Sequence, residues 1–274
     1  PRFSRLLIAA AVLACTGACR TMDIAVMPPE ESSDDFLIPT QKGPGDTWDD
    51  AIAVSKASGQ VKLGLLEHGD EALAARISLI RSAKKSIAIQ TFNWKTDESG
   101  RFVLWELLRA VKQRGVEVNI LIDQLYCEQD PKMVAFLSSF DPRFRLKFYN
   151  PRFNQLSLST IEQLADLAYD FHSFNVRLHN KLFIVDDHIV ITGGRNFSNR
   201  YFDRSIGLNY KDRDVLAILP RPEPVLRCFS EYWESAYSVP ASDLEDIAKL
   251  LKDNNKNVIE QAAVIKALNK NNTI

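Results

Sequence analysis

The segment RLHNKLFIVDDHIVITGGRNFSN, at positions 177–199, constrains the fold of this chain more than any other. KLFIV (181–185) is short, apolar and rich in β-branched residues, which predicts a buried strand. The pair Asp186-Asp187 predicts a turn, and IVIT (189–192) predicts a second strand that runs back along the first. We therefore expect a β-hairpin in this part of the chain.

Polar residues at defined spacing accompany this hairpin. His179 and Lys181 share one face of the first strand by the period of two, and Asn196 follows the second strand. The glycines Gly193 and Gly194 let the backbone approach a neighbour closely. An imidazole nucleophile, an ammonium and an amide together suit a phosphoryl group that gains charge during reaction. The segment has no carboxylate–histidine array with metal-ligand spacing, so we expect no metal.

The segment resembles the HKD motif of the phospholipase D superfamily, usually written HxKxxxxDxxxxxxG(S/G)xN. The filled positions are His179, Lys181, Asp186, Gly193, Gly194 and Asn196. The resemblance implies that His179 is the nucleophile and forms a phosphohistidine, and that Lys181 and Asn196 bind the phosphoryl oxygens. It implies a structural role for Asp186, contact between the substrate phosphate and the backbone of Gly193 and Gly194, and no cofactor. Gly194 stands where many members have serine, which removes one hydroxyl.

The fold class follows from alternating strand and helix patterns before the motif. Strands are predicted at 86–92, 116–123 and 145–149, with helices at 101–113 and 131–140 between them. The stretch from Gln90 to Asp123 resembles the cardiolipin-synthase branch of the superfamily. We expect an α/β fold, a phospholipase D-like domain with a mixed, mostly parallel sheet flanked by helices. A strand at 212–219 and a helix at 222–237 complete the expected domain.

Superfamily members place a carboxylate just ahead of the strand at 212–219, where it orients the catalytic imidazole. Asp212 is the first candidate for that role and Asp214 the second, because both lie on one face of the strand. The alternative is that both aspartates only balance neighbouring basic residues at a strand entrance. The sequence leaves these two interpretations open.

The superfamily's site needs two His-x-Lys units, and this chain supplies one. Its four histidines are His68, His172, His179 and His188, and only His179 begins such a unit. Either two copies form a homodimer with a shared site, or the chain is the amino-terminal half of a two-motif protein. The cardiolipin-synthase resemblance favours the second interpretation, because those members carry both motifs in one chain.

The amino terminus predicts export. Arg2 and Arg5 precede an apolar run at 6–14, which is typical of a signal peptide rather than a transmembrane helix. Cys15 lies in a lipobox-like sequence, and Cys19 is the competing lipidation site. We expect a signal at 1–19, a tether at 20–60, the phospholipase D-like domain at 61–240 and a helical extension at 241–274. The mature protein would be a membrane-anchored lipoprotein that faces the periplasm or the cell exterior.

The expected function is a phospholipase D-type phosphatidyltransferase or phosphodiesterase that acts on membrane phospholipid, like a cardiolipin synthase. The alternatives are an exported nuclease of the same superfamily and an inactive half-chain that binds anionic lipid. The net charge of −1 disfavours nucleic acid as a partner, because phosphate contacts dominate that affinity. Cys127 and Cys228 either form a disulfide or remain free thiols. An aromatic cluster at 169–174 is either core or the border of an acyl-chain channel.

Overall fold

The computed structural model describes residues 47–124, 130–157 and 176–253. The first part contains α2 (Trp48–Ser58), β1 (Lys62–Leu66), α3 (Gly69–Ser82), β2 (Ser86–Thr91), α4 (Glu98–Arg114) and β3 (Glu117–Asp123). The second contains α5 (Pro131–Phe140), β4 (Phe144–Tyr149) and the 3₁₀ turn η1 (Arg152–Asn154). The third contains β5 (Leu182–Val185), β6 (Ile189–Gly193), η2 (Asn199–Tyr201), β7 (Asp214–Ile218), α8 (Glu223–Trp233), β8 (Ser238–Pro240), η3 (Ala241–Asp243) and α9 (Glu245–Lys252).

Eight strands of the described residues form one sheet in the order β1-β7-β6-β5-β2-β3-β4-β8. Only the β2–β3 and β3–β4 pairs are parallel, and the other five pairs are antiparallel. The predicted mixed α/β sheet is confirmed, whereas its mostly parallel character is wrong. The strand–helix alternation before the motif does make a parallel unit, but the motif hairpin pairs antiparallel with β2 and β7 extends that pattern.

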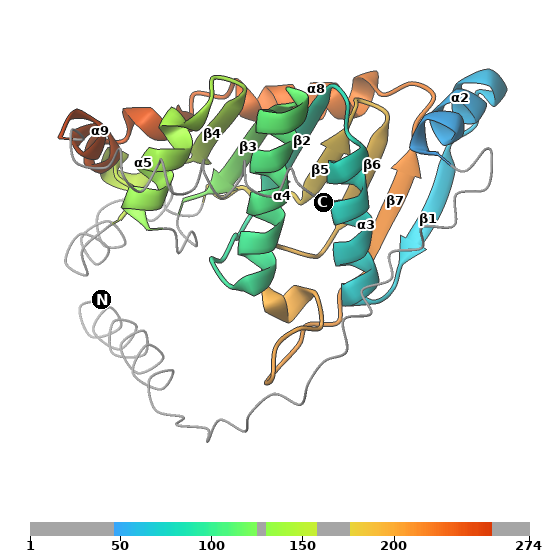
Figure 1. Cartoon of the computed structure of the whole chain (residues 1–274), viewed down its shortest axis with the longest axis horizontal. Helices are drawn as coiled ribbons and strands as arrows, with labels where there is room; N and C mark the ends of the chain where they lie inside the picture. Colours follow the sequence, from blue (N-terminus) through green and yellow to red (C-terminus); the bar gives the residue numbers. More distant parts are fainter. Residues whose placement is uncertain (1–46, 125–129, 158–175, 254–274) are drawn as a thin grey trace, which may run out of the picture. The chain divides into compact units, whose positions relative to one another are not determined.

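The sheet buries one apolar core on each face, because successive strand residues point to opposite sides. Ile120 and Ile122 of β3 pack in the larger core, whose helical side comes from α3, α4 and α5. Leu121, between them, packs in a second core with Phe229 and Trp233 of α8. Figure 1 shows α3 and α4 side by side in front of the sheet. The motif hairpin lies in the middle of the sheet, covered on both faces.

The ends of the helices around β2 and β3 follow the sequence closely. Asp97 accepts a hydrogen bond from the Gly100 backbone N–H at 3.1 Å and so caps α4. Gly115 ends that helix in the left-handed region at φ 73°, as the glycine predicts. Asp130 caps α5, and Pro131 is the first residue of that helix, a position at which proline is favoured. These capping residues fix where the helices begin and end. They therefore also fix the loops in which polar residues follow the ends of the strands.

Two predictions about the borders of the folded part are wrong. Residues 48–58 form α2 rather than a tether, and Trp48 and Ile52 pack against the larger core. Beyond β8, α9 buries Ile247 and packs against α5, so this helix has a core to bury against. Amphipathicity alone did not reveal these tertiary partners.

Several predicted features lie outside the described residues. These are the signal with Cys15 and Cys19, Cys127 of the pair with Cys228, and the segment from 160 to 174 with its aromatic cluster and His172. Cys228 itself is exposed on α8. No helix within residues 47–124, 130–157 and 176–253 has the length and apolar character that a bilayer span requires.

Candidate functional site

The closed end of the β5–β6 hairpin is fixed by Asp186. The loop between the paired residues Val185 and Ile189 has three residues, and the first two have positive φ, 47° for Asp186 and 67° for Asp187, a conformation that aspartate tolerates. The Asp186 carboxylate accepts backbone N–H bonds from Lys84, Lys85 and Ser86 at 2.9, 2.7 and 3.0 Å. It therefore joins the hairpin to the start of β2. The predicted structural role of Asp186 has a direct physical basis in these bonds.

His179 and Lys181 lie together at the opposite end of the hairpin, just before β5. The exposed His179 ring lies 5.0 Å from the Phe92 ring, measured between centroids. The Lys181 ammonium lies 5.3 Å from the centroid of the same ring and donates to the His179 carbonyl at 2.8 Å. Burial lowers the pKa of Lys181, and the nearby Asp212 carboxylate opposes this effect. The two residues that are predicted to act on one phosphoryl group thus lie beside the same aromatic ring, that of Phe92.

The backbone that leads to His179 is held by the ends of two other strands. Asp123, buried at the end of β3, accepts the Leu178 backbone N–H at 2.8 Å and an Arg177 N–H at 3.2 Å. Asn150, after β4, donates its side-chain N–H to the Val176 carbonyl at 2.8 Å. These contacts position the residue immediately before His179. Sequence reasoning missed Asp123, because 55 residues separate it from Leu178.

Asn196 is buried and holds the end of β2 to the loop after the motif. Its side-chain oxygen accepts from the Thr91 hydroxyl at 3.2 Å and the Asn93 backbone N–H at 3.0 Å. Its amide nitrogen donates to the Tyr201 hydroxyl at 2.9 Å. One of the two amide N–H bonds is therefore already committed to Tyr201. Phosphoryl binding by Asn196 stays a prediction, while its contacts give it a clear positioning role.

Asp212 lies over Gly194 and close to Lys181. A Cβ atom added to Gly194 would come within 2.7 Å of the Asp212 Cγ atom, so the glycine makes room for this carboxylate. Asp212 acts electrostatically on Lys181 and on Tyr201, and burial is the larger cause of the raised pKa of Tyr201. In the part of the chain that the structure describes, no hydrogen bond joins Asp212 to His179. The orienting role of Asp212 stays a prediction.

Asp214, the second candidate for orienting His179, has a different role. It is buried and forms ion pairs with Arg76 at 2.8 Å and Arg195 at 3.5 Å, so its suggested contact with the imidazole is wrong. A Cβ atom on Gly193 would collide with Asp214 Oδ1 and with the Arg213 carbonyl. Gly193 is thus needed for close packing of β6 against β7. The two glycines thus make room for Asp214 and Asp212, whereas the sequence interpretation had assigned the glycines to contact with the substrate phosphate.

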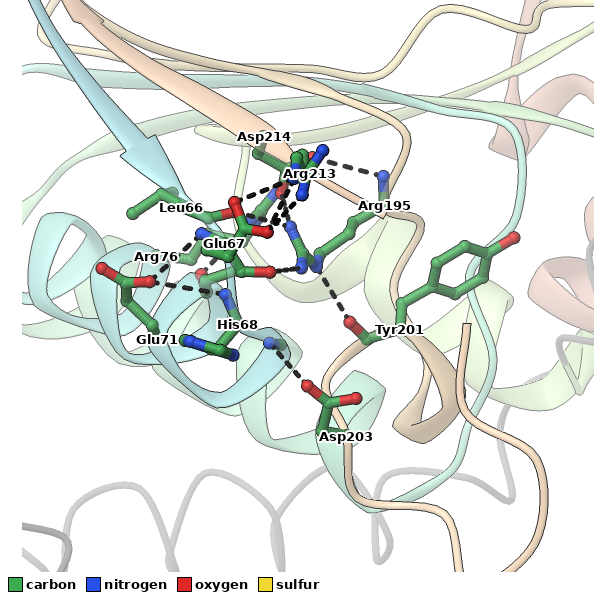
Figure 2. Close-up of polar contacts among 12 residues, drawn as sticks. Leu66, Glu67, His68, Glu71, Arg76, Arg195, Tyr201, Asp203, Arg213 and Asp214 are labelled. Carbon is green, nitrogen blue, oxygen red and sulfur yellow. Dashed lines mark hydrogen bonds and ion pairs between the residues drawn. The ribbon is translucent and has the colours of Figure 1, made fainter. Parts of the chain in front are cut away.

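Arg76, Arg195 and Asp214 form a buried ionic cluster behind the motif (Figure 2). Arg195 also donates to the carbonyls of Leu66, Glu67 and Tyr201 at 3.0, 2.7 and 3.1 Å. The Arg76 guanidinium donates to one carbonyl, that of Ala72 at 2.9 Å. Burial lowers the pKa of Arg76, and Asp214 counteracts it.

Arg76 also lies over two aromatic rings, 5.6 Å from the Phe202 centroid and 5.8 Å from that of Phe197. Cation–π contacts of this kind partly replace the hydration that a buried guanidinium loses. Sequence reasoning missed both arginines. Arg195 carried one signal, its place between the motif residues Gly194 and Asn196.

The site is built from side chains that can bind and attack an anion. Within the three described ranges, no cluster of His, Cys, Asp and Glu residues has the arrangement of a metal site. His179 supplies an exposed imidazole, and Lys181 supplies a cation beside it. This pair can attack a phosphorus centre and offset the charge that develops on its oxygens.

This chain is similar in sequence to several known proteins. The family model described as "Cardiolipin synthase, PLD-like domain" matches residues 77–225. An uncharacterized protein of Helicobacter pylori is 38% identical over 195 residues, which cover 71% of this chain and 38% of the relative. Cardiolipin synthase C of Escherichia coli is 34% identical over 193 residues, which cover 70% of this chain and 39% of the relative. The chain therefore spans about two fifths of the length of these relatives.

Among solved structures, phosphatidylserine synthase of Haemophilus influenzae is similar with a TM-score of 0.50 and 19% identity. The similar region covers 76% of this chain and 43% of that protein. At this level of identity the likeness concerns the fold alone.

Proposed function

Because this chain belongs to the phospholipase D superfamily, in its cardiolipin synthase-like branch, we propose that it transfers or hydrolyses the phosphatidyl group of a membrane phospholipid. The observation that carries the proposal is the pairing of an exposed His179 with Lys181 on the Phe92 ring. The motif that contains them lies inside the matched family region. The finer assignment, a phospholipid substrate, extends what is known of cardiolipin synthase relatives to this chain.

The proposed reaction has two steps that share one intermediate. His179 attacks the phosphorus of the phosphodiester, the bond to the leaving alcohol breaks, and a phosphohistidine forms. An acceptor hydroxyl then attacks the same phosphorus and releases His179. A lipid alcohol as acceptor gives transfer, and water gives hydrolysis. Lys181 offsets the charge on the phosphoryl oxygens, a contribution of about 3–4 kcal/mol per donor in comparable sites.

A second imidazole is needed to protonate the leaving alkoxide. His179 is the only histidine of this sequence that begins a His-x-Lys unit. We therefore propose that the second unit comes from a second copy of the chain or from another domain. This second His-x-Lys unit would approach the end of the hairpin at which His179 is exposed.

The direct test is product formation on vesicles of phosphatidylglycerol. We expect cardiolipin with release of glycerol, or phosphatidic acid when water is the acceptor. His179→Ala should lower the rate at least about a thousandfold, since no other group replaces the nucleophile. His188→Ala is the matched control, because His188 lies at the closed end of the hairpin and contacts the Leu219 carbonyl. Equal loss in both variants, or no product from wild type, would contradict the proposal.

Mixing wild type with His179→Ala identifies the source of the second imidazole. If two copies share one site, each active unit needs two intact chains, so an equal mixture after exchange keeps about a quarter of the activity. If another domain supplies the acid, each intact chain works independently, and about half of the activity remains. Light scattering on the same samples reports whether the chain dimerises.

The competing proposal is a phosphodiesterase that acts on nucleic acid, since the same nucleophile can attack any accessible phosphodiester. The exposure of His179 at the end of the hairpin is compatible with a polymeric substrate. The net charge of −1 counts against it. Cleavage of DNA should then fall steeply with added salt, whereas turnover of a lipid substrate should be much less sensitive.

We also propose that the chain is exported and anchored as a lipoprotein through Cys15 or Cys19. The support is the order of basic residues, apolar run and cysteine in the sequence. Metabolic labelling with a fatty acid tests it. Cys15→Ala should remove the label if Cys15 is the modified residue, and Cys19→Ala should remove it in the other case.

A further inference from the structure

The loop between η2 and β7 exposes large apolar side chains beside the motif. Ile206 is 100% exposed and Leu208 is 65% exposed, and Tyr210 follows two residues later. Figure 1 shows the loop after η2 extending away from the end of the sheet. Apolar residues at such a position add nothing to the core. Exposed apolar groups flanked by polar residues instead mark contact with a partner or a membrane.

Polar contacts at its base, rather than apolar packing, hold the loop in shape. The Ser205 backbone N–H donates to the Asn209 side-chain oxygen at 3.0 Å, and the Asn209 amide donates back to the Ser205 carbonyl at 3.1 Å. The Tyr210 backbone N–H donates to the Arg200 carbonyl at 2.8 Å, and the Tyr210 ring lies 4.8 Å from that of Tyr201. Ile206 and Leu208 are thus presented at the tip of a braced loop without being needed to brace it.

The charge of this segment suits an anionic surface. Residues 200–211 contain three basic side chains and one acidic side chain, a net charge of +2 in a chain whose net charge is −1. Lys211 pairs with Asp203 at 3.1 Å, and Arg204 pairs with Glu98 of α4 at 3.4 Å. Such exposed pairs are weak in water and leave the cations able to approach anionic headgroups. An aromatic residue that lies between an apolar loop tip and basic residues at the foot of the loop, as Tyr210 does, is typical of a segment that binds at a membrane surface.

The loop is anchored on the motif at both ends. Tyr201, before it, accepts the hydrogen bond from Asn196, and Asp212, after it, lies over Gly194. We propose that the loop 203–211 inserts Ile206 and Leu208 into an anionic phospholipid surface, with Arg200, Arg204 and Lys211 at the level of the headgroups. This inference rests on the proposed function for its purpose, because insertion would bring headgroup phosphates to the site.

The test places an environment-sensitive NBD dye on the loop tip. The dye is attached to Ile206→Cys in the full chain with its four cysteines replaced by serine. Leu63→Cys is the matched control, because Leu63 is 71% exposed on the edge strand β1 and pairs with Ala217 of β7, outside the loop 203–211. Vesicles of phosphatidylglycerol should shift the emission of the dye at position 206 to shorter wavelength and leave position 63 unchanged. Phosphatidylcholine vesicles should give a smaller shift.

A second measurement uses unlabelled protein. Ile206→Ser with Leu208→Ser should weaken binding to phosphatidylglycerol vesicles by about tenfold or more, since two apolar side chains lose their burial. Leu63→Ser with Leu65→Ser should leave that affinity unchanged, although Leu65 is also 57% exposed.

Three outcomes would overturn the inference. These are no shift at position 206, equal shifts at both positions, and a dye at 206 that is already shielded before vesicles are added, which would mean that protein covers the loop. A failure of the proposed function would be recognised by a separate result. Insertion of the loop without any phosphatidyl product contradicts the function alone, and product formation with a water-exposed dye contradicts the loop alone.

Discussion

Two groups of ionisable side chains lie within a few residues of one another in the sequence. One group is buried, whereas the other lies at the exposed end of the hairpin. In the buried ionic cluster, Asp214 binds Arg76 and Arg195 away from solvent. At the end of the hairpin, His179 is exposed and Lys181 is partly desolvated. The segments 193–196 and 212–214 contribute to both. Asp214 is the first residue of β7 and pairs with the two arginines, whereas Asp212 lies before the strand, over Gly194 and close to Lys181. One short segment therefore supplies a carboxylate that stabilises the fold and another that borders the site.

The largest effect on stability should come from Asp214→Asn. Removing this carboxylate leaves two guanidinium groups buried without a counter-charge, which costs about 3–5 kcal/mol of unfolding free energy. Urea unfolding measures the change. Asp212→Asn is the matched control, two residues away at the site, and should cost less than about 1 kcal/mol.

A double substitution sharpens this prediction. Arg195 retains three backbone carbonyls when Asp214 is neutralised, whereas Arg76 retains one. Arg76→Met in the Asp214→Asn background should therefore recover part of the lost stability. If Asp212→Asn costs as much as Asp214→Asn, the distinction between the two regions is wrong.

Asp123→Asn should affect the site more than the core. The substitution weakens the carboxylate contacts to Leu178 and Arg177, so the backbone before His179 loses a fixed position. We expect a loss of about 1–3 kcal/mol in stability and a tenfold to hundredfold fall in kcat with little change in KM.

Asp130→Asn is the matched control for Asp123→Asn. Asp130 caps α5, and asparagine is an equally good cap, so stability and activity should stay close to wild type. A fall in stability without any fall in kcat would mean that Asp123 has no positioning role for His179.

Asp212→Asn should change the pH dependence rather than the stability. Asp212 raises the pKa of Lys181 against the larger lowering effect of burial, so its neutralisation should lower that pKa further. The ammonium would then lose its proton at lower pH, and the alkaline limb of kcat/KM would move to lower pH. A pH–rate profile measures this shift. Lys181→Arg should remove that limb, because arginine does not titrate there. If the alkaline limb of kcat/KM in Asp212→Asn stays at the wild-type pH, Asp212 does not influence the pKa of Lys181 in this way.

The smallest effect should come from an exposed pair. Two bonds from Arg143 hold the pKa of Asp141 at about 2, below its ordinary value of 3.8. The stabilisation is therefore present above about pH 4 and is lost as the pH falls toward 2. Because the Arg143 side chain is 45% exposed, Asp141→Asn should cost less than about 1 kcal/mol at pH 7 and only a small part of that at pH 2. Urea unfolding at both pH values tests this contrast with Asp214.

Local signals predicted the elements well where a cap or a period defined them. The hairpin with its Asp186-Asp187 turn and both ends of α5 lie where the sequence indicated, whereas α4 begins at Glu98, ahead of the predicted start at 101. The errors concern partners. Whether β5 meets β2 parallel or antiparallel, and whether α2 and α9 find a surface to bury against, depends on contacts between distant parts of the chain. A pattern of apolar residues does not specify those contacts.

The sequence by itself determined the motif, the hairpin that carries it and the family to which the chain belongs, because residue type and spacing encode all three. Only the tertiary structure decided that Asp214, at the start of β7, is buried with arginines and that Asp212, which precedes the strand, lies close to Lys181. It also decided that the glycines of the motif make room for those aspartates and that Asp123 holds the residue before His179. The reason is physical: the period of a strand gives the face of each residue, but the neighbours on that face come from segments far away in the chain.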